Sequence, residues 1–155
     1  MIDDLPDCYL LMNSRYLNTD LDIESVEDLS PLIKILKRKC DLLHGGKDDA
    51  GLWRVTIEAR NSGFVGGEGH DQVADINEIL KVIESLSDEI QKLLLGAQKF
   101  EFNIGWQSSE KRPVGAFSLP TELLGRVAGI GATIAVTIYP SNENDFEEEA
   151  SNMTT

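Results

Sequence analysis

Residues 51–60 read GLWRVTIEAR, and this stretch decides the fold class because apolar and polar side chains alternate along it. One side carries Trp53, Val55, Ile57 and Ala59, and the other carries Leu52, Arg54, Thr56 and Glu58. A period of two residues is typical of a strand that buries one face and exposes the other. The same alternation returns at residues 99–106 (KFEFNIGW), which place Phe100, Phe102, Ile104 and Trp106 on one face. Two half-buried strands favour an antiparallel or mixed sheet over a fully buried parallel one.

Helical periodicity fills much of the chain around these two strands. Ser30-Pro31 supplies an N-cap and a first-turn proline, and the apolar stripe that follows predicts a helix that Gly45-Gly46 ends. Residues 71–95 predict two helices, divided at Ser85–Glu89, where a new cap follows a break in the stripe. A further helix is predicted at residues 120–130.

Three more strands complete the predicted fold. They lie at residues 8–17 (CYLLMNSRYL), 115–119 and 132–139 (ATIAVTIY), the middle one being short. After the first of them, Asn18-Thr19-Asp20 predicts a turn and residues 20–28 predict an acidic connector. The fold class is therefore predicted as α+β, with an antiparallel or mixed sheet of about four to five strands and helices packed mainly on one face.

The length of 155 residues suits one domain, which we place at residues 1–140. Residues 141–155 hold five acids and no base, so they predict a flexible acidic tail. The N-terminal residues are acidic, where a secretion signal would be basic, and no apolar run approaches the roughly 20 residues of a membrane helix. We therefore expect a cytoplasmic protein.

The formal net charge of −13 indicates which classes of partner the chain favours and which it repels. Such a charge repels nucleic acid and anionic membrane surfaces, and it attracts cationic partners. The acids are concentrated in residues 1–29 and 71–98, which indicates acidic faces rather than an even coat. We therefore expect a basic protein partner and no direct contact with nucleic acid or membrane, and the pattern leaves the oligomeric state open.

No motif with catalytic or metal-binding spacing is present. The glycine-rich loop at residues 61–70 lacks the lysine of a phosphate-binding loop, although a strand precedes it and a helix follows. His44 and His70 do not combine with Cys8 or Cys40 into a metal-ligand spacing. The acidic connector lacks the glycine and the closing glutamate of a calcium loop. We therefore expect a protein without metal or cofactor that is not an enzyme.

The candidate binding residues form two acidic patches and one aromatic anchor. The first patch comprises Asp20, Asp22, Glu24, Glu27 and Asp28. The second patch comprises Asp75, Glu78, Asp88 and Glu89. The role of both would be charge complementarity with the partner. Trp106, at a strand end that polar residues follow, has two interpretations: a core residue, or an anchor at the interface.

Several short motifs carry a family resemblance. They are Gly51-Leu52-Trp53, Phe102–Trp106, Gly115–Leu119, Glu122-Leu123-Leu124, and Gly131-Ala132 before a strand that ends Ile138-Tyr139. Together they resemble the bacterial domain-of-unknown-function family numbered 4279, over the C-terminal two thirds of the chain. These motifs are turn glycines, a helix start and strand apolars, so the resemblance implies no catalytic residue. It implies a role as an immunity protein beside a bacterial toxin.

The charge and the resemblance together predict an immunity-type inhibitor. Such a protein would bind and neutralise a cognate basic toxin domain, such as a nuclease, through an acidic face. The alternative is a small ligand-binding domain or an enzyme of unknown substrate, with residues 61–70 near its site.

Overall fold

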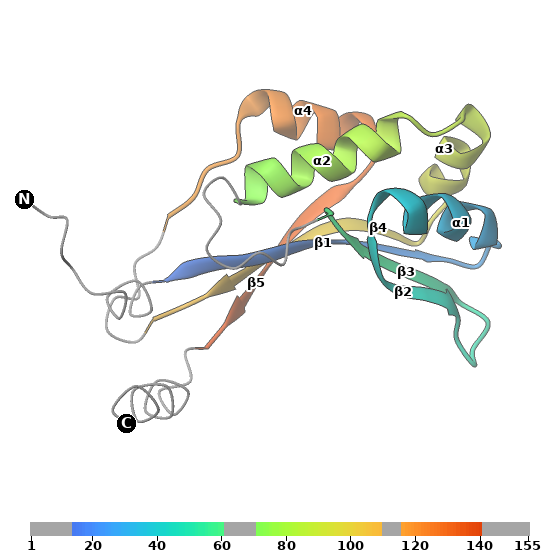
Figure 1. Cartoon of the computed structure of the whole chain (residues 1–155), viewed down its shortest axis with the longest axis horizontal. Coiled ribbons are helices and arrows are strands. Elements are labelled where there is room, and N and C mark those ends of the chain that lie inside the picture. Colours follow the sequence, from blue (N-terminus) through green and yellow to red (C-terminus); the bar gives the residue numbers. More distant parts are fainter. Residues whose placement is uncertain (1–13, 61–70, 110–115, 141–155) are drawn as a thin grey trace, which may run out of the picture.

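The computed structural model describes residues 14–60, 71–109 and 116–140, and it shows an α+β fold (Figure 1). The described residues form a five-stranded mixed sheet with four helices, and these helices all cover the same face of the sheet. The strands are β1 (Arg15–Ser25), β2 (Asp41–Lys47), β3 (Trp53–Glu58), β4 (Lys99–Gln107) and β5 (Thr133–Tyr139). The helices are α1 (Ser30–Lys39), α2 (Gln72–Glu84), α3 (Asp88–Leu95) and α4 (Thr121–Gly129). The predicted fold class is confirmed.

Strand β1 lies at the centre of the sheet, whose order is β2-β3-β1-β4-β5. It pairs antiparallel with both neighbours, so Leu21 lies opposite Ile57 of β3 and Phe102 of β4. Strand β2 also pairs antiparallel with β3, whereas β5 runs parallel to β4. Strands β2 and β5 are therefore the two edges of the sheet.

The core fills the space between the sheet and the helices. Every second residue of a strand faces this space, and one stripe of each helix faces it from above, so both layers remove apolar surface from water. The fully buried side chains include Leu21, Ile23, Ile57, Phe102 and Ile104 from the strands and Leu32, Leu36, Ile76, Ile79 and Leu80 from the helices.

The prediction for residues 18–28 is wrong, because β1 runs through the expected turn and most of the expected connector. The segment has a period of two: Thr19, Leu21, Ile23 and Ser25 are buried, and the residues between them are partly exposed. The acids at every second position gave the segment the composition of a loop. Their alternation with buried residues is the stronger signal, because it matches the pleat of a strand.

The prediction that α1 continues to Gly45-Gly46 is also wrong. The helix ends at Lys39, and β2 begins two residues later, so His44 lies in an edge strand rather than in a last helical turn. Gly45 lies inside β2 and close to two apolar side chains, so it does not act as a helix stop. A Cβ atom at Gly45 would lie 3.2 Å from Leu42 Cδ2 and 3.3 Å from Ile33 Cγ2.

The remaining helices lie where the sequence predicts them. The break between α2 and α3 is confirmed, and each helix has a side-chain cap. Asp71 Oδ1 accepts a hydrogen bond from the backbone N–H of Ala74 at 2.8 Å, and Ser87 Oγ accepts one from Ile90 at 3.5 Å. The expected strand at 115–119 is wrong for residues 116–119, which form no strand.

Some predictions concern parts of the chain outside the described residues. They are the beginning of the first expected strand, the loop at 61–70, and the tail at 141–155. Among the described residues, no helix is long and apolar enough to cross a membrane.

Candidate functional site

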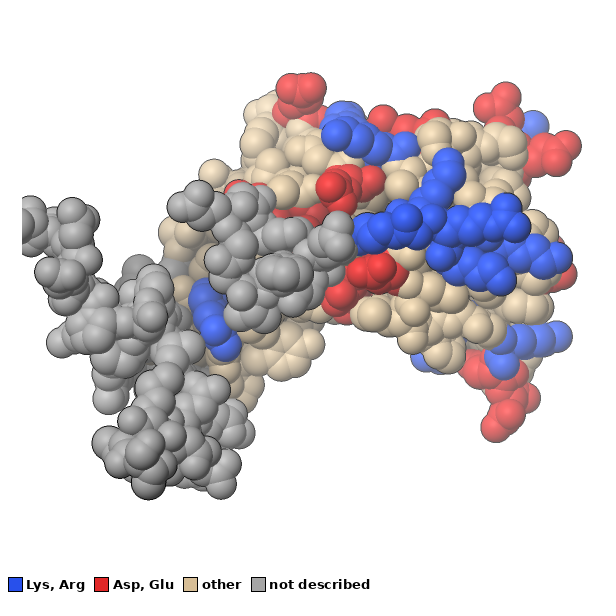
Figure 2. All heavy atoms as spheres, in the orientation of Figure 1, with Lys and Arg blue, Asp and Glu red and all other residues tan. Residues whose placement is uncertain are grey.

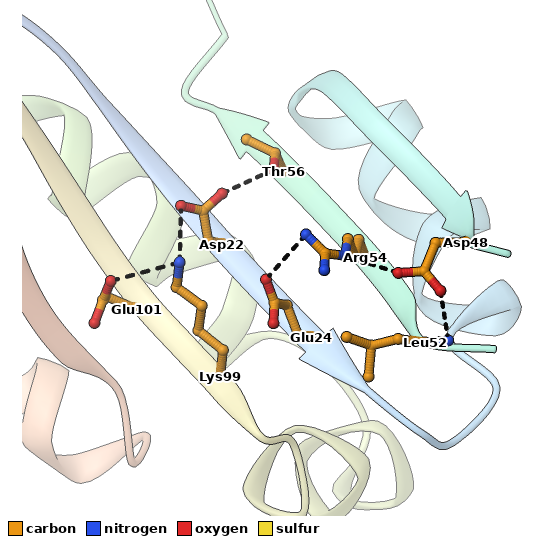
Figure 3. A network of polar contacts seen from close by, with 8 residues as sticks. All are labelled: Asp22, Glu24, Asp48, Leu52, Arg54, Thr56, Lys99 and Glu101. Atoms are coloured by element: carbon orange, nitrogen blue, oxygen red, sulfur yellow. Dashed lines mark hydrogen bonds and ion pairs between the residues drawn. The ribbon is translucent and has the colours of Figure 1, made fainter. Parts of the chain in front are cut away.

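The face of the sheet that the helices leave uncovered is polar, and we call it the open face. Its side chains come from alternate positions of neighbouring strands. They include Asn18, Asp20, Asp22 and Glu24 of β1, Arg54, Thr56 and Glu58 of β3, and Lys99, Glu101 and Asn103 of β4. Figure 3 shows part of this face, with the carboxylates of β1 between the basic side chains of β3 and β4.

Asp22 lies near the middle of the open face and has a contact on each side (Figure 3). Thr56 Oγ1 donates a hydrogen bond to Asp22 Oδ1 at 2.8 Å. Lys99 Nζ lies 3.8 Å from Asp22 Oδ2 and 3.7 Å from Glu101 Oε1, so one ammonium group lies between two carboxylates. Because these ion pairs face water, each contributes at most about 1 kcal/mol to stability, and a partner can replace them.

Arg54 connects the end of β1 to the turn between β2 and β3. Its Nη1 lies 3.6 Å from Glu24 Oε1, and its Nε donates to Asp48 Oδ2 at 3.1 Å. Asp48 also accepts the backbone N–H groups of Leu52 at 2.9 Å and Ala50 at 3.0 Å. The hydrogen bond from Leu52 is the main reason why the pKa of Asp48 lies below its usual range. This turn therefore fixes the direction of the Arg54 side chain.

Asp20 and Glu58 lie opposite each other on β1 and β3 and form a carboxyl pair. The Asn18 side chain donates to both, at 3.0 Å to Asp20 Oδ1 and at 2.9 Å to Glu58 Oε1. Partial burial raises the pKa of Asp20 to about 7, and the hydrogen bond and negative charge of Glu58 act in the same direction. Near neutral pH, Asp20 is therefore divided between its protonated and ionised forms.

Gly105 makes room for the Asn18 side chain. The two residues are register partners on β4 and β1, and a Cβ atom at Gly105 would lie only 2.4 Å from Asn18 Oδ1. With the amide oxygen above Gly105, the amide nitrogen points to the carboxyl pair. The glycine thus helps to orient the group that holds Asp20 and Glu58 together.

The first predicted patch is divided by the structure. Asp20, Asp22 and Glu24 lie together on the open face, as alternate residues of one strand. Glu27 and Asp28 follow the end of β1 and are exposed. Asp28 Oδ1 accepts the backbone N–H of Ser30 at 2.8 Å, and this bond lowers the pKa of Asp28. Asp28 therefore supports the start of α1 and lies outside the strand that carries the other three acids.

The prediction that Asp75 belongs to a surface patch is wrong. Asp75 is 1% exposed and lies on the face of α2 that packs against the sheet. Tyr16 Oη donates to Asp75 Oδ2 at 2.5 Å and lies 2.7 Å from Thr19 Oγ1. Burial and the hydrogen bond to Asp75 raise the pKa of Tyr16, so its hydroxyl keeps its proton. Asp75 thus binds α2 to β1 beneath the surface.

The other members of the second patch are exposed, but they lie in different parts of the structure. Glu78 lines a shallow groove of about 250 Å³ together with the basic residues Lys39, Arg60 and Lys81. Figure 2 shows lysine and arginine side chains gathered over the region of α1, whose last turn is basic. Asp88 and Glu89 lie in the first turn of α3, where negative charge favours the helix dipole.

Trp106 lies on the helix side of the sheet and not on the open face. It stacks on Phe117, with ring centroids 5.1 Å apart and an interplanar angle of 30°. The side chain is half-buried, so packing is part of its role. The interpretation of Trp106 as an anchor remains a prediction, and such an anchor would act on a different side of the molecule from Asp20.

The sequence interpretation missed the polar residues that surround the three acids. The sequence predicts a turn at Asn18, and it places Arg54 and Glu58 only on the polar side of their own strand. Their common signal is the period of two, which places them on the open face once β1 is recognised as a strand.

The described residues contain no group of three or more histidine, cysteine, aspartate or glutamate side chains that could hold a metal ion. Burial raises the pKa of the Cys40 thiol to about 11, so this cysteine is a protonated core residue rather than a nucleophile. His70 and Cys8 lie outside the described residues.

Comparisons with known proteins give no relative. No protein-family model matches the chain, and neither the curated proteins nor the solved structures contain a match.

Proposed function

We propose that this protein is an immunity-type inhibitor that binds a basic toxin domain through its open face. The observation that carries the proposal is the position of Asp20, Asp22 and Glu24, which alternate along the central strand and all face solvent. A central strand is held on both sides, so these carboxylates form a row on a rigid surface. A rigid and acidic surface suits a partner whose own surface is basic.

The charge of the whole chain supports the same partner. A net charge of −13 steers a basic protein toward the chain over distances beyond direct contact. Glu58 and Glu101 extend the row of acids across β3 and β4, while Arg54 and Lys99 hold some of these carboxylates in place. A partner's lysine or arginine can replace these weak internal ion pairs when it docks.

The immunity-type role is the specific form of this proposal. A nuclease toxin needs a basic surface to hold the phosphates of its substrate. A row of carboxylates on a sheet presents negative charge to that surface and blocks it sterically. The choice of this role over a general acidic binding domain rests on the resemblance proposed for the motifs between Gly51 and Tyr139, which no family model matches.

Charge reversal on the open face tests the proposal. The test needs a toxin partner, sought by pull-down or in the neighbouring genes, and association is measured at low and high salt. Asp20→Lys with Glu24→Lys should slow association at least about tenfold, because steering by surface charge acts mainly on the association rate. Asp88→Lys with Glu89→Lys replaces two exposed acids of α3 by lysine and is the matched control. An equal effect of both variants, or an acidic partner, would overturn the proposal.

A small ligand-binding domain or enzyme is the second candidate, and Asp20 is the observation that favours it. A carboxyl group whose pKa lies at about 7 can donate or accept a proton at neutral pH. The loop at 61–70, which the sequence favours for this role, lies outside the described residues. Turnover of a small molecule that Asp20→Asn abolishes would replace the inhibitor proposal with this one.

A further inference from the structure

The two edges of the sheet differ in their protection against pairing with another strand. Strand β2 carries the charged or polar residues Asp41, His44 and Lys47, and its register with β3 shifts between Leu42 and His44. Charges and irregularities of this kind keep an edge strand from pairing. Strand β5 reads TIAVTIY and carries no charged side chain. It is therefore an edge without the usual protection.

Half of the backbone groups of β5 point away from the rest of the sheet. The carbonyl oxygen of Tyr139 accepts the backbone N–H of Ser108 at 2.9 Å, so Tyr139 points its backbone groups toward β4. Backbone groups alternate in direction along a strand, so those of Ile134, Val136 and Ile138 point away from β4. Within the described part of the chain, β4 is the only strand that pairs with β5.

The same residues expose apolar side chains. Val136 is 47% exposed and Ile138 is 66% exposed, although both lie on the same face of β5 as Ile134, which packs against the core. Exposed apolar side chains on an uncharged, unpaired edge favour the addition of another strand.

We propose that β5 pairs antiparallel with β5 of a second copy of this chain, so that two sheets join into one across a two-fold axis. The strand is complementary to itself when the axis passes at Val136. Val136 then lies opposite Val136 of the other copy, and Ile134 lies opposite Ile138. Residues opposite each other with outward backbone groups exchange two hydrogen bonds, and apolar residues on the same face gain a cross-strand contact.

A second copy fits this edge better than an unrelated strand for two reasons. The antiparallel arrangement places no charged side chain opposite another, which matters between chains of charge −13. An interface that uses the same surface on both copies also closes at two and leaves no further β5 edge. Both open faces then lie on the same side of the joined sheet, so this inference does not depend on the proposed function.

The first test measures the mass of the full-length chain by light scattering over a range of concentrations. The wild type should reach twice the mass of one chain. Val136→Lys should raise the dissociation constant about tenfold or more, because two like charges then face each other across the axis. Leu43→Lys is the matched control: it places the same charge at a 55% exposed leucine on the other edge strand.

Mixing of variants tests the register. Val136→Lys and Val136→Glu should each be monomeric alone and should form a mixed dimer together, because opposite charges then meet at the axis. Val136→Cys should form a disulfide between copies under mild oxidation, since opposed residues lie within the Cα separation that a disulfide spans. Leu43→Cys should not.

Three outcomes would overturn the inference. The first is a wild-type monomer at every concentration. The second is a dimer that Val136→Lys leaves intact, which would show that another surface holds the copies together. The third is a failure of Val136→Cys to cross-link while the wild type dimerises.

Discussion

Asp20 and Asp75 illustrate how one residue type takes two roles in this chain. Asp75 is buried between α2 and the sheet, where an unpaired carboxylate would be strongly destabilising, and the Tyr16 hydroxyl supplies its hydrogen bond. Asp20 is only partly buried and lies beside a second carboxyl group, Glu58. The first carboxylate holds a helix on the sheet, whereas the second gives the open face a charge that depends on pH.

Asp20 should make the stability of the protein depend on pH. Its pKa is raised from 3.8 to about 7 on folding. Between these two pH values, the folded state therefore holds a proton at Asp20 that the unfolded state has lost. The stabilisation from this group is complete at low pH and is lost as the pH rises toward 7. Relative to the wild type, Asp20→Asn should therefore gain stability over this window, on the order of 1 kcal/mol after solvent screening.

Urea unfolding of the wild type and of Asp20→Asn at several pH values checks this expectation. Glu58→Gln should reduce the same pH dependence, because it removes the neighbouring negative charge. Asp49→Asn changes an exposed acid in a turn and serves as the control. The expectation would be contradicted if the difference in free energy of unfolding between Asp20→Asn and the wild type did not vary with pH.

At the scale of elements, the stack of Trp106 on Phe117 joins the end of β4 to the segment that precedes α4. Trp106→Ala should destabilise the protein by about 2 kcal/mol, below the 3–5 kcal/mol of a fully buried ring, because the side chain is half-buried. A double-mutant cycle with Phe117→Ala should give a coupling energy of about 0.5–1.5 kcal/mol. Chemical unfolding of the three variants measures both quantities, and additive effects would show that the stack contributes nothing of its own.

The elements with a clear period were predictable from the sequence. Residues 53–58, 99–107 and 133–139 form strands where apolar alternation predicts them, and a serine cap at Ser87 marks the division between α2 and α3. Only the first three residues of β1 fall within the strand predicted at 8–17, because acids occupy the outer positions of the rest and give it the composition of a connector. Strand β2 is not predicted, because the apolar stripe of α1 continues in the sequence through Leu42. Gly45-Gly46 then resembles the glycine stop that often follows a helix.

The candidate site was predictable only in part. Three acids of the first patch do lie on one face, but their grouping depends on β1 being a strand. The carboxyl pair of Asp20 and Glu58 depends on the register between β1 and β3, which no local pattern specifies. The burial of Asp75 depends on which side of α2 meets the sheet, and a charged residue gives no hint of a buried hydrogen bond from Tyr16.

At the scale of the whole molecule, charge and apolar surface lie in different places. The open face carries acids, the last turn of α1 carries Lys37, Arg38 and Lys39, and the β5 edge carries no charge. The two proposed associations, partner binding on the open face and self-association at β5, would therefore use different residues.

Salt should change these two associations in opposite directions. Partner binding should weaken as salt rises, because salt screens the attraction between opposite charges. Self-association should strengthen, because salt screens the repulsion between two chains of charge −13 while leaving apolar contacts in place. Calorimetric titration with the partner and sedimentation of the free protein, over the same salt series, check both trends. Two trends of the same sign would show that one of the surfaces is misassigned.

The central position of β1 also has a consequence for synthesis on the ribosome. Residues 15–25 emerge early, but one of their two neighbours, residues 99–107, is made much later. At roughly 5–20 residues per second, the strand waits for several seconds before its second edge is paired. A waiting strand is a site for aggregation, and a charge at every second position is an effective safeguard against it. We therefore expect the acids of β1 to act before the fold exists, by keeping the nascent chain soluble until β4 is made.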